Sequence, residues 1–167
     1  MSNFFQKRHS RKTRQARFGI CDVPPPPHRP AYIDHLNGKD WIAVVENNWK
    51  EEVSFVPIDH CITLKSPTKK TAKRCDGMLY YKSTLIFVEL KEIKARDKNW
   101  INTAVEQLKS TIDHYERSAT KKSFDTKKAY IANKKATQFK QPRFECMNRF
   151  FDETGYTLNI STRISID

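Results

Sequence analysis

The stretch that decides the fold is Cys75-Asp-Gly-Met-Leu-Tyr-Tyr-Lys-Ser-Thr-Leu-Ile-Phe-Val-Glu-Leu-Lys91. Its two halves are rich in aromatic and β-branched residues, which favour β-strands. We take Lys82 and Ser83 as the two-residue loop of a tight hairpin. Tyr81 then pairs with Thr84, and Asp76 falls opposite Glu89.

Alternation along the hairpin assigns its side chains to two faces. Asp76, Met78 and Tyr80 share one face with Leu85, Phe87 and Glu89, while Gly77, Leu79 and Tyr81 share the other with Thr84, Ile86 and Val88. Because both faces are substantially apolar, the hairpin is predicted to lie inside a sheet that is covered on both sides.

Directly opposed residues have Cβ atoms about 4.5–5.5 Å apart, and like charges there destabilise the pair. Asp76 and Glu89 therefore need a shared proton or a cation between them. Lys91 projects from the same face roughly 6–7 Å further along. Since one lysine does not neutralise both acids, the pattern predicts a divalent ion: Mg²⁺, with Mn²⁺ as the alternative.

A metal ion at this position could stabilise charge on a phosphodiester and position an attacking water. Lys91 would orient or help to deprotonate that water, or stabilise the transition state. The residues thus favour metal-dependent phosphodiester hydrolysis.

The same segment resembles the PD-(D/E)xK nuclease superfamily, in which an aspartate begins one strand and the next strand ends in Glu-x-Lys, here Glu89-Leu90-Lys91. The resemblance covers about residues 53–132 and implies the α-β-β-β-α-β core of the restriction-endonuclease-like fold. It implies that Asp76 and Glu89 bind the metal, that the Leu90 carbonyl adds a ligand, and that Lys91 serves the water. It also implies that Gln107, on the following helix, faces the site.

Two features depart from that superfamily's pattern. Cys75 replaces the proline of the motif, and the sequence before Val53 reads as a strand where a first helix is expected. That helix often donates a further acid, and Glu46, Glu51 and Glu52 are nearby without an assigned place. We expect an extra N-terminal strand instead.

The rest of the chain predicts an α/β fold, a mixed sheet flanked by helices. Residues 1–30, with Pro24-Pro-Pro-Pro27, are expected to form a basic, proline-rich arm, and residues 31–167 a single nuclease-like domain. An apolar stripe at helical spacing comprises Ile101, Val105, Leu108, Ile112 and Tyr115. We expect strands at 41–45, 53–64, 75–81, 84–93, 129–132 and 156–166, and helices at 99–117 and at 143–153, the second ending before Gly155.

The formal net charge of +12 suits a polyanionic partner, although a solubilising surface gives the same balance. Two blocks, residues 1–18 and 65–74, contain no acid. We expect nucleic acid, DNA rather than RNA, as the partner. The candidate contact residues are Lys69, Lys70, Lys73, Arg74 and Lys94.

Four scattered cysteines show no zinc-ligand spacing and are expected to be free thiols. No membrane-spanning run and no secretion signal is visible, so we expect a cytoplasmic protein without a membrane partner. Asp59 could be a third acid at the site or a loop cap. His60 is interpreted as structural, and Trp100 as packing at the start of its helix.

Three functions remain open from the sequence. The first is a Mg²⁺-dependent nuclease. The second is a catalytically silent nuclease-fold module that binds nucleic acid or a protein partner. The third is an interaction protein whose proline tract and basic arm are the contacts, and a homodimer is compatible with each. Salt-sensitive binding and metal-dependent nicking would separate them.

Overall fold

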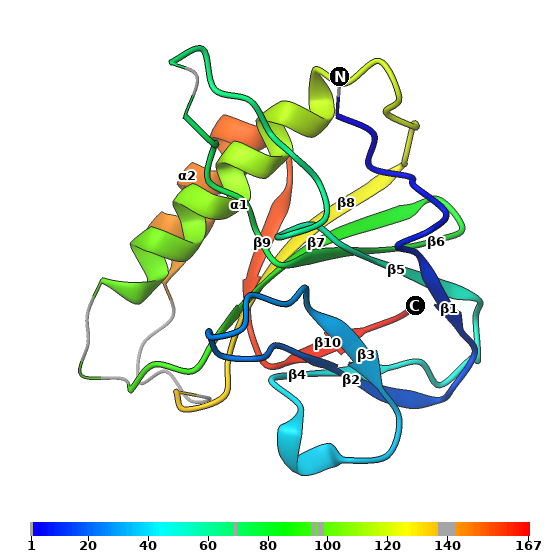
Figure 1. The fold of residues 1–167 in the computed structure, drawn as a ribbon. Coiled ribbons are helices and arrows are strands. Elements are labelled where there is room, and N and C mark those ends of the chain that lie inside the picture. The colour runs from blue at the N-terminus through cyan, green and yellow to red at the C-terminus, as the bar shows by residue number, and fades with distance from the viewer. Residues whose placement is uncertain (1, 69, 95, 97–98, 137–142) are drawn as a thin grey trace.

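A computed structural model describes residues 2–68, 70–94, 96, 99–136 and 143–167. The protein is a mixed α/β fold in which two mixed sheets pack together and helices cover the outer face of the larger sheet (Figure 1). Each layer follows from an apolar face that must be buried against another element.

The larger sheet has six strands in the order β1-β5-β6-β7-β8-β9. The pairs β1–β5, β5–β6 and β6–β7 are antiparallel, whereas β7, β8 and β9 run parallel to one another. The parallel connection from β7 to β8 runs through helix α1 (Trp100–Glu116), because parallel neighbours need a crossover. The strands are β1 (Arg11–Thr13), β5 (Val53–Pro57), β6 (Gly77–Tyr81), β7 (Thr84–Lys91), β8 (Thr126–Asn133) and β9 (Thr157–Ile160).

The smaller sheet has four strands in the order β10-β4-β2-β3. Here β10 is parallel to β4, and the other pairs are antiparallel. A short 3-10 helix, η1 (Gly38–Asp40), follows β3 and precedes β4 in the chain. The strands are β2 (Arg17–Cys21), β3 (Tyr32–Asp34), β4 (Ala43–Glu46) and β10 (Arg163–Ser165).

Helices α1 (Trp100–Glu116) and α2 (Phe144–Thr154) lie on the face of the larger sheet opposite the smaller one (Figure 1). The expected stripe on α1 is confirmed, since Ile101, Leu108, Ile112 and Tyr115 are buried. Trp100 is buried at the start of the helix, as expected. Helix α2 ends at Gly155, whose left-handed φ of 75° suits glycine.

The central hairpin divides the apolar core into two clusters, as its alternation predicted. Met78, Leu85 and Phe87 pack in the cluster beneath α1, whereas Leu79, Ile86 and Val88 pack in the cluster shared with the smaller sheet. The hairpin is therefore covered on both faces. Its register also agrees with the prediction, from Tyr81 opposite Thr84 to Gly77 opposite Val88.

Two expected strands differ from the structure. The strand expected at 53–64 ends at Pro57, because Asp59 and His60 form a turn in which His60 has a left-handed φ of 62°. The strand expected at 156–166 divides into β9 and β10, which join different sheets. The break occurs because the Ser161 hydroxyl bonds to the backbone of Arg163 and turns the chain.

The segment 1–30 is not the separate arm expected from the sequence. Residues Arg11–Thr13 form β1 at the edge of the larger sheet, and Arg17–Cys21 form β2 inside the smaller one. Phe4 is fully buried against Phe87 and Tyr115. The proline tract itself lies in a loop, as expected. Within the described ranges, no helix has the length and apolarity to cross a bilayer.

Candidate active site

The start of β6 and the end of β7 bring Asp76 and Glu89 together. The β6–β7 ladder reaches Gly77 opposite Val88, and the next step places Asp76 opposite Glu89. The backbone carbonyl of Asp76 accepts a hydrogen bond from Ile58 at 2.9 Å, which fixes this residue between two strands. The predicted side-by-side arrangement of the two acids therefore follows from ordinary hairpin pairing.

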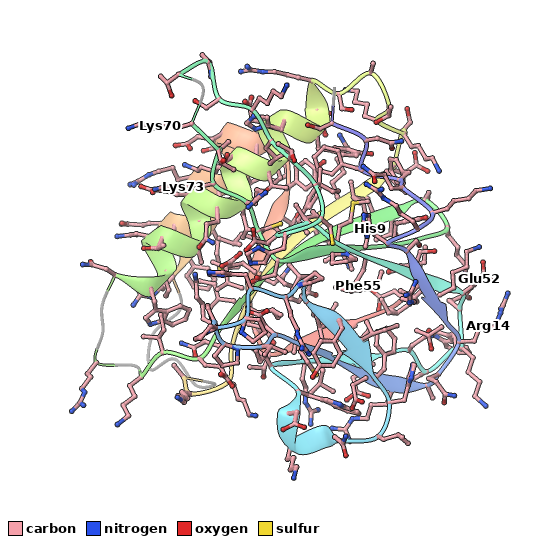
Figure 2. The ribbon with its side chains drawn as sticks, in the orientation of Figure 1. His9, Arg14, Glu52, Phe55, Lys70 and Lys73 are labelled. Atoms are coloured by element: carbon pink, nitrogen blue, oxygen red, sulfur yellow. The ribbon has the colours of Figure 1, made fainter. Side chains whose placement is uncertain are left out.

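Gly77 allows β6 to approach β5 closely beside Asp76. A Cβ atom at this position would lie 2.6 Å from the Phe55 ring, which is too close for unstrained packing. Figure 2 marks Phe55 on the sheet beside the hairpin. The glycine after the aspartate therefore serves the packing that holds Asp76 at the strand end.

Glu89 is buried, with 1% of its surface exposed. Lys91 Nζ lies 2.8 Å from Glu89 Oε1, whereas Oε2 has no hydrogen-bond partner within the described part of the chain. Burial, and then the negative charge of Asp76, raise the pKa of Glu89 well above its ordinary value, against the opposing effect of Lys91. An unpartnered oxygen on a buried acid calls for a proton or a cation.

Asp76 is held by the backbone of the neighbouring strand. Its Oδ2 accepts a hydrogen bond of 2.7 Å from the Leu90 N–H. Burial nevertheless raises the pKa of Asp76 to about 7, and the negative charges of Asp22 and Asp59 add to the rise. The two acids thus hold protons more readily than free carboxyl groups do when no cation is present.

Helix α1 reaches the site through Gln107, as expected from the sequence. Its amide oxygen accepts a hydrogen bond of 2.8 Å from Lys91 Nζ, and its amide nitrogen donates one of 3.1 Å to the Arg74 carbonyl. One turn further, the Thr111 hydroxyl accepts from the Cys75 N–H at 2.8 Å. Two polar residues of α1 therefore hold both the lysine and the segment that leads into Asp76.

Asp59 has one of the two roles left open by the sequence, that of a loop cap. It caps its own turn, accepting from the His60 N–H at 3.1 Å, and it pairs with Arg74 at 2.9 Å. Its charge also acts on Asp76. The His60 ring lies 3.2 Å from Asp59 and packs against His28, which agrees with the structural role expected for it.

Sequence reasoning missed Asp22, which follows β2 in the smaller sheet. Burial, followed by the charge of Asp59, raises its pKa, and its own charge acts on Asp76. A residue so distant in the chain gives no periodic signal. The one sequence feature that distinguishes Asp22 is that it is the first acidic residue of the chain, after 21 residues without Asp or Glu.

Of the residues predicted to contact nucleic acid, some form ion pairs within the protein and others are exposed. Arg74 is bound internally by Asp59 and the Ile62 carbonyl, and Lys73 pairs with Glu106 on α1. Lys70 and Lys94 are exposed, and Figure 2 places Lys70 and Lys73 beside α1. Lys69 lies outside the described residues. Arg74 therefore acts mainly within the structure.

The donor set fits a magnesium ion in kind. Two carboxylates and a backbone carbonyl offer the hard oxygen ligands that Mg²⁺ takes, and it commonly uses only one or two protein carboxylates. The unpartnered Oε2 of Glu89 is consistent with such an ion. Within the described ranges, no group of three or more His, Cys, Asp or Glu side chains is arranged to hold a metal.

Comparison with known proteins gives no relative. No family model, curated protein or solved structure matches the chain. The functional argument therefore rests on the geometry of the site itself.

Proposed function

We propose that the protein is a metal-dependent nuclease that hydrolyses phosphodiester bonds, with Asp76 and Glu89 as ligands of Mg²⁺. The observation that carries the proposal is the unpartnered Oε2 of buried Glu89, beside Asp76 and with Lys91 in contact. The ion pair with Lys91 leaves this oxygen without a partner, so a proton shared with Asp76 or a bound cation has to supply one. A nucleic acid is the expected substrate, because the chain has a large positive charge, and DNA is the polymer proposed here.

The order of elements supports the restriction-endonuclease-like fold. Three antiparallel strands, β5, β6 and β7, are followed by α1 and by the parallel strand β8. This reproduces the β-β-β-α-β part of the core that the resemblance implies. Before β5, the described residues contain only strands and the short helix η1, so the first helix of that core has no counterpart there.

A bound divalent ion would neutralise charge on the scissile phosphate and make a coordinated water more acidic. Asp76 and Glu89 would hold it once both have lost their protons. The hydrogen bond from Leu90 N–H fixes the orientation of the Asp76 carboxylate, and Lys91 fixes one oxygen of Glu89. Both ligands are therefore oriented before substrate arrives.

Lys91 has three N–H donors, of which Glu89 and Gln107 occupy two. The third has no partner among the residues that the structure describes, and it would orient the attacking water or bind a phosphate oxygen as charge develops there. Only 14% of the Lys91 side chain is exposed, so water screens its charge less than it screens the charge of a surface lysine.

The test is cleavage of a supercoiled plasmid and of a labelled RNA in Mg²⁺, Mn²⁺ or EDTA. We expect metal-dependent nicking by the natural protein and none by the Glu89→Gln variant. Equal activity of that variant would reject the assignment.

The second candidate is a silent nuclease-fold module. The observation that favours it is that Lys91 already neutralises one oxygen of Glu89, as a resident cation would. In this case the same experiment gives nucleic-acid binding in EDTA with no nicking in any metal.

A further inference from the structure

The open edge of the larger sheet is strongly basic. Strand β1 is the outermost strand and pairs only with β5. The exposed cations in and beside it are called here the basic edge, and they lie in a segment without acids. They are Lys7, Arg8, Arg11, Lys12 and Arg14.

The basic edge runs from the candidate site toward the far end of β5. Strand β1 is antiparallel to β5, so that Thr13 pairs with Val53 at the start of β5. At the other end, Arg11 pairs with Phe55, and two residues further along β5 Pro57 pairs with Gly77, the residue after Asp76. A five-residue strand such as β5 spans about 17 Å.

An exposed tryptophan stands at the far end of this edge. Trp49, in the turn between β4 and β5, has 77% of its surface exposed, which is unusual for so large an apolar ring. The turn is rigidly built: fully buried Asn47 bonds to the backbones of Gln15 and Glu51. An exposed indole carried on an ordered turn is suited to stacking on a planar partner.

The basic edge keeps a net positive charge although Glu52 lies beside it. Glu52 contacts both Lys12 and Arg14, and Figure 2 shows Arg14 and Glu52 at the same corner of the molecule, away from Lys70 and Lys73. All three side chains of this cluster are about half exposed or more. Because such exposed ion pairs are weak, a polyanion can replace the glutamate without a large loss.

We propose that the basic edge and Trp49 bind a nucleic-acid strand with unpaired bases, which runs from the candidate site along β1 and stacks a base on the indole. The inference deepens the proposed function, on which it rests, by naming a substrate with a single-stranded segment. A length of about 17 Å accommodates about five stacked nucleotides at ~3.4 Å each. An indole at a distance from the site stacks on an exposed base, whereas paired bases offer it no free face.

Cations on an edge strand also prevent edge-to-edge pairing of sheets. That role accounts for the lysines and arginines but not for the rigid presentation of Trp49. The tryptophan therefore decides between the two explanations, and it is the residue to change first.

The experiment measures binding in EDTA, so that cleavage does not enter. Fluorescein-labelled oligothymidylate and oligouridylate of about 20 nucleotides, and a duplex of the same length, are titrated with each variant at several salt concentrations. The test variants are Trp49→Ala, Trp49→Phe and the double change Lys12→Gln/Arg14→Gln. The matched controls are Leu36→Ala, which removes another exposed apolar side chain, and Arg117→Gln/Lys121→Gln, which removes two other exposed, paired cations.

We expect Trp49→Ala to weaken single-strand binding about 5- to 150-fold, with Trp49→Phe retaining most of the affinity and the duplex little affected. The double change should lower the salt slope by about 1.4, at about 0.7 for each lost phosphate contact. The DNA and RNA arms show which polymer is bound. Unchanged affinity and slope in folded variants, or equal effects in the controls, would overturn the proposal.

The proposed function and this surface can fail separately. Loss of nicking in Glu89→Gln together with normal binding in Trp49→Ala would support the nuclease function and contradict the proposed binding surface. Binding that depends on Trp49, with no metal-dependent nicking by the natural protein, would support the binding surface and contradict the nuclease function.

Discussion

Lys91 and Gln107 are joined by a hydrogen bond of 2.8 Å that ties the end of β7 to α1. The amide of Gln107 is in turn anchored on the Arg74 carbonyl, two residues before Asp76. One side chain of the helix therefore sets the position of the lysine relative to the acids. This arrangement makes Gln107 a positioning residue in the proposed mechanism.

Replacing Gln107 with leucine should slow metal-dependent nicking roughly 10- to 100-fold, the range found for residues that orient a metal site from outside it. Metal binding should be largely kept, because Asp76 and Glu89 are unchanged. Single-turnover nicking and a metal titration measure the two effects. The control is Asn102→Ala, an exposed polar change on the same helix. A Gln107→Leu protein as active as the control would contradict this role.

Glu89→Gln should abolish nicking in Mg²⁺ and weaken metal binding, because the buried carboxylate is replaced by a neutral amide of the same shape. Glu106→Gln, which changes an exposed acid on α1, is the matched control and should leave both properties unchanged. Isothermal titration with Mn²⁺ provides a readout independent of activity. Normal Mn²⁺ binding by Glu89→Gln would remove this residue from the ligand set.

Asp76 should make the stability of the metal-free protein fall with rising pH. Burial raises its pKa from 3.8 to about 7, so the folded state binds a proton more tightly than the unfolded state. Its contribution is present at pH below 3.8 and is lost as the pH rises through about 7. Asp76→Asn should therefore be more stable than the natural protein in EDTA at about pH 8, with a smaller difference at about pH 5.

Thermal melts at these two pH values, with and without Mg²⁺, measure the effect. Mg²⁺ should raise the melting temperature of the natural protein more at the higher pH, because binding needs the ionised carboxylate. It should leave Asp76→Asn unchanged. A metal-induced shift that is equal at both pH values would argue against the coupling of proton and cation at this position.

Gly77→Ala should destabilise the protein by about 1–3 kcal/mol, as overpacking of a filled core does. The added methyl group would lie 2.6 Å from the Phe55 ring. Gly38→Ala is the control, since a Cβ there meets no atom within 4 Å. Combining Gly77→Ala with Phe55→Leu should recover part of the loss in a double-mutant cycle. Additive effects would show that the two positions do not interact.

The hairpin and its two acids could be predicted because they follow from local alternation. Once Lys82 and Ser83 are taken as the loop, the pleat alone sets Asp76 opposite Glu89 and assigns each side chain to a face. The stripe on α1 is equally local, and it brings Gln107 to the site. These features need no knowledge of distant parts of the chain.

The smaller sheet could not be predicted in the same way. Its strands β2, β3 and β10 have only three to five residues, and their partners are set by contacts far apart in sequence. The break between β9 and β10 arises from the Ser161 hydroxyl, without a glycine or proline to mark it. The charge of Asp22 raises the pKa of Asp76 only because this sheet packs where it does, so the effect could not be seen in the sequence.

The pairing of β10 with β4 has a consequence for biosynthesis. Ile164 and Ile166 belong to the cluster behind the hairpin, so this cluster stays incomplete until residues 163–166 have left the ribosome. Domains fold as units when their sequence is complete. The apolar cluster behind Asp76 and Glu89 should therefore be completed only when this segment of the chain has been translated.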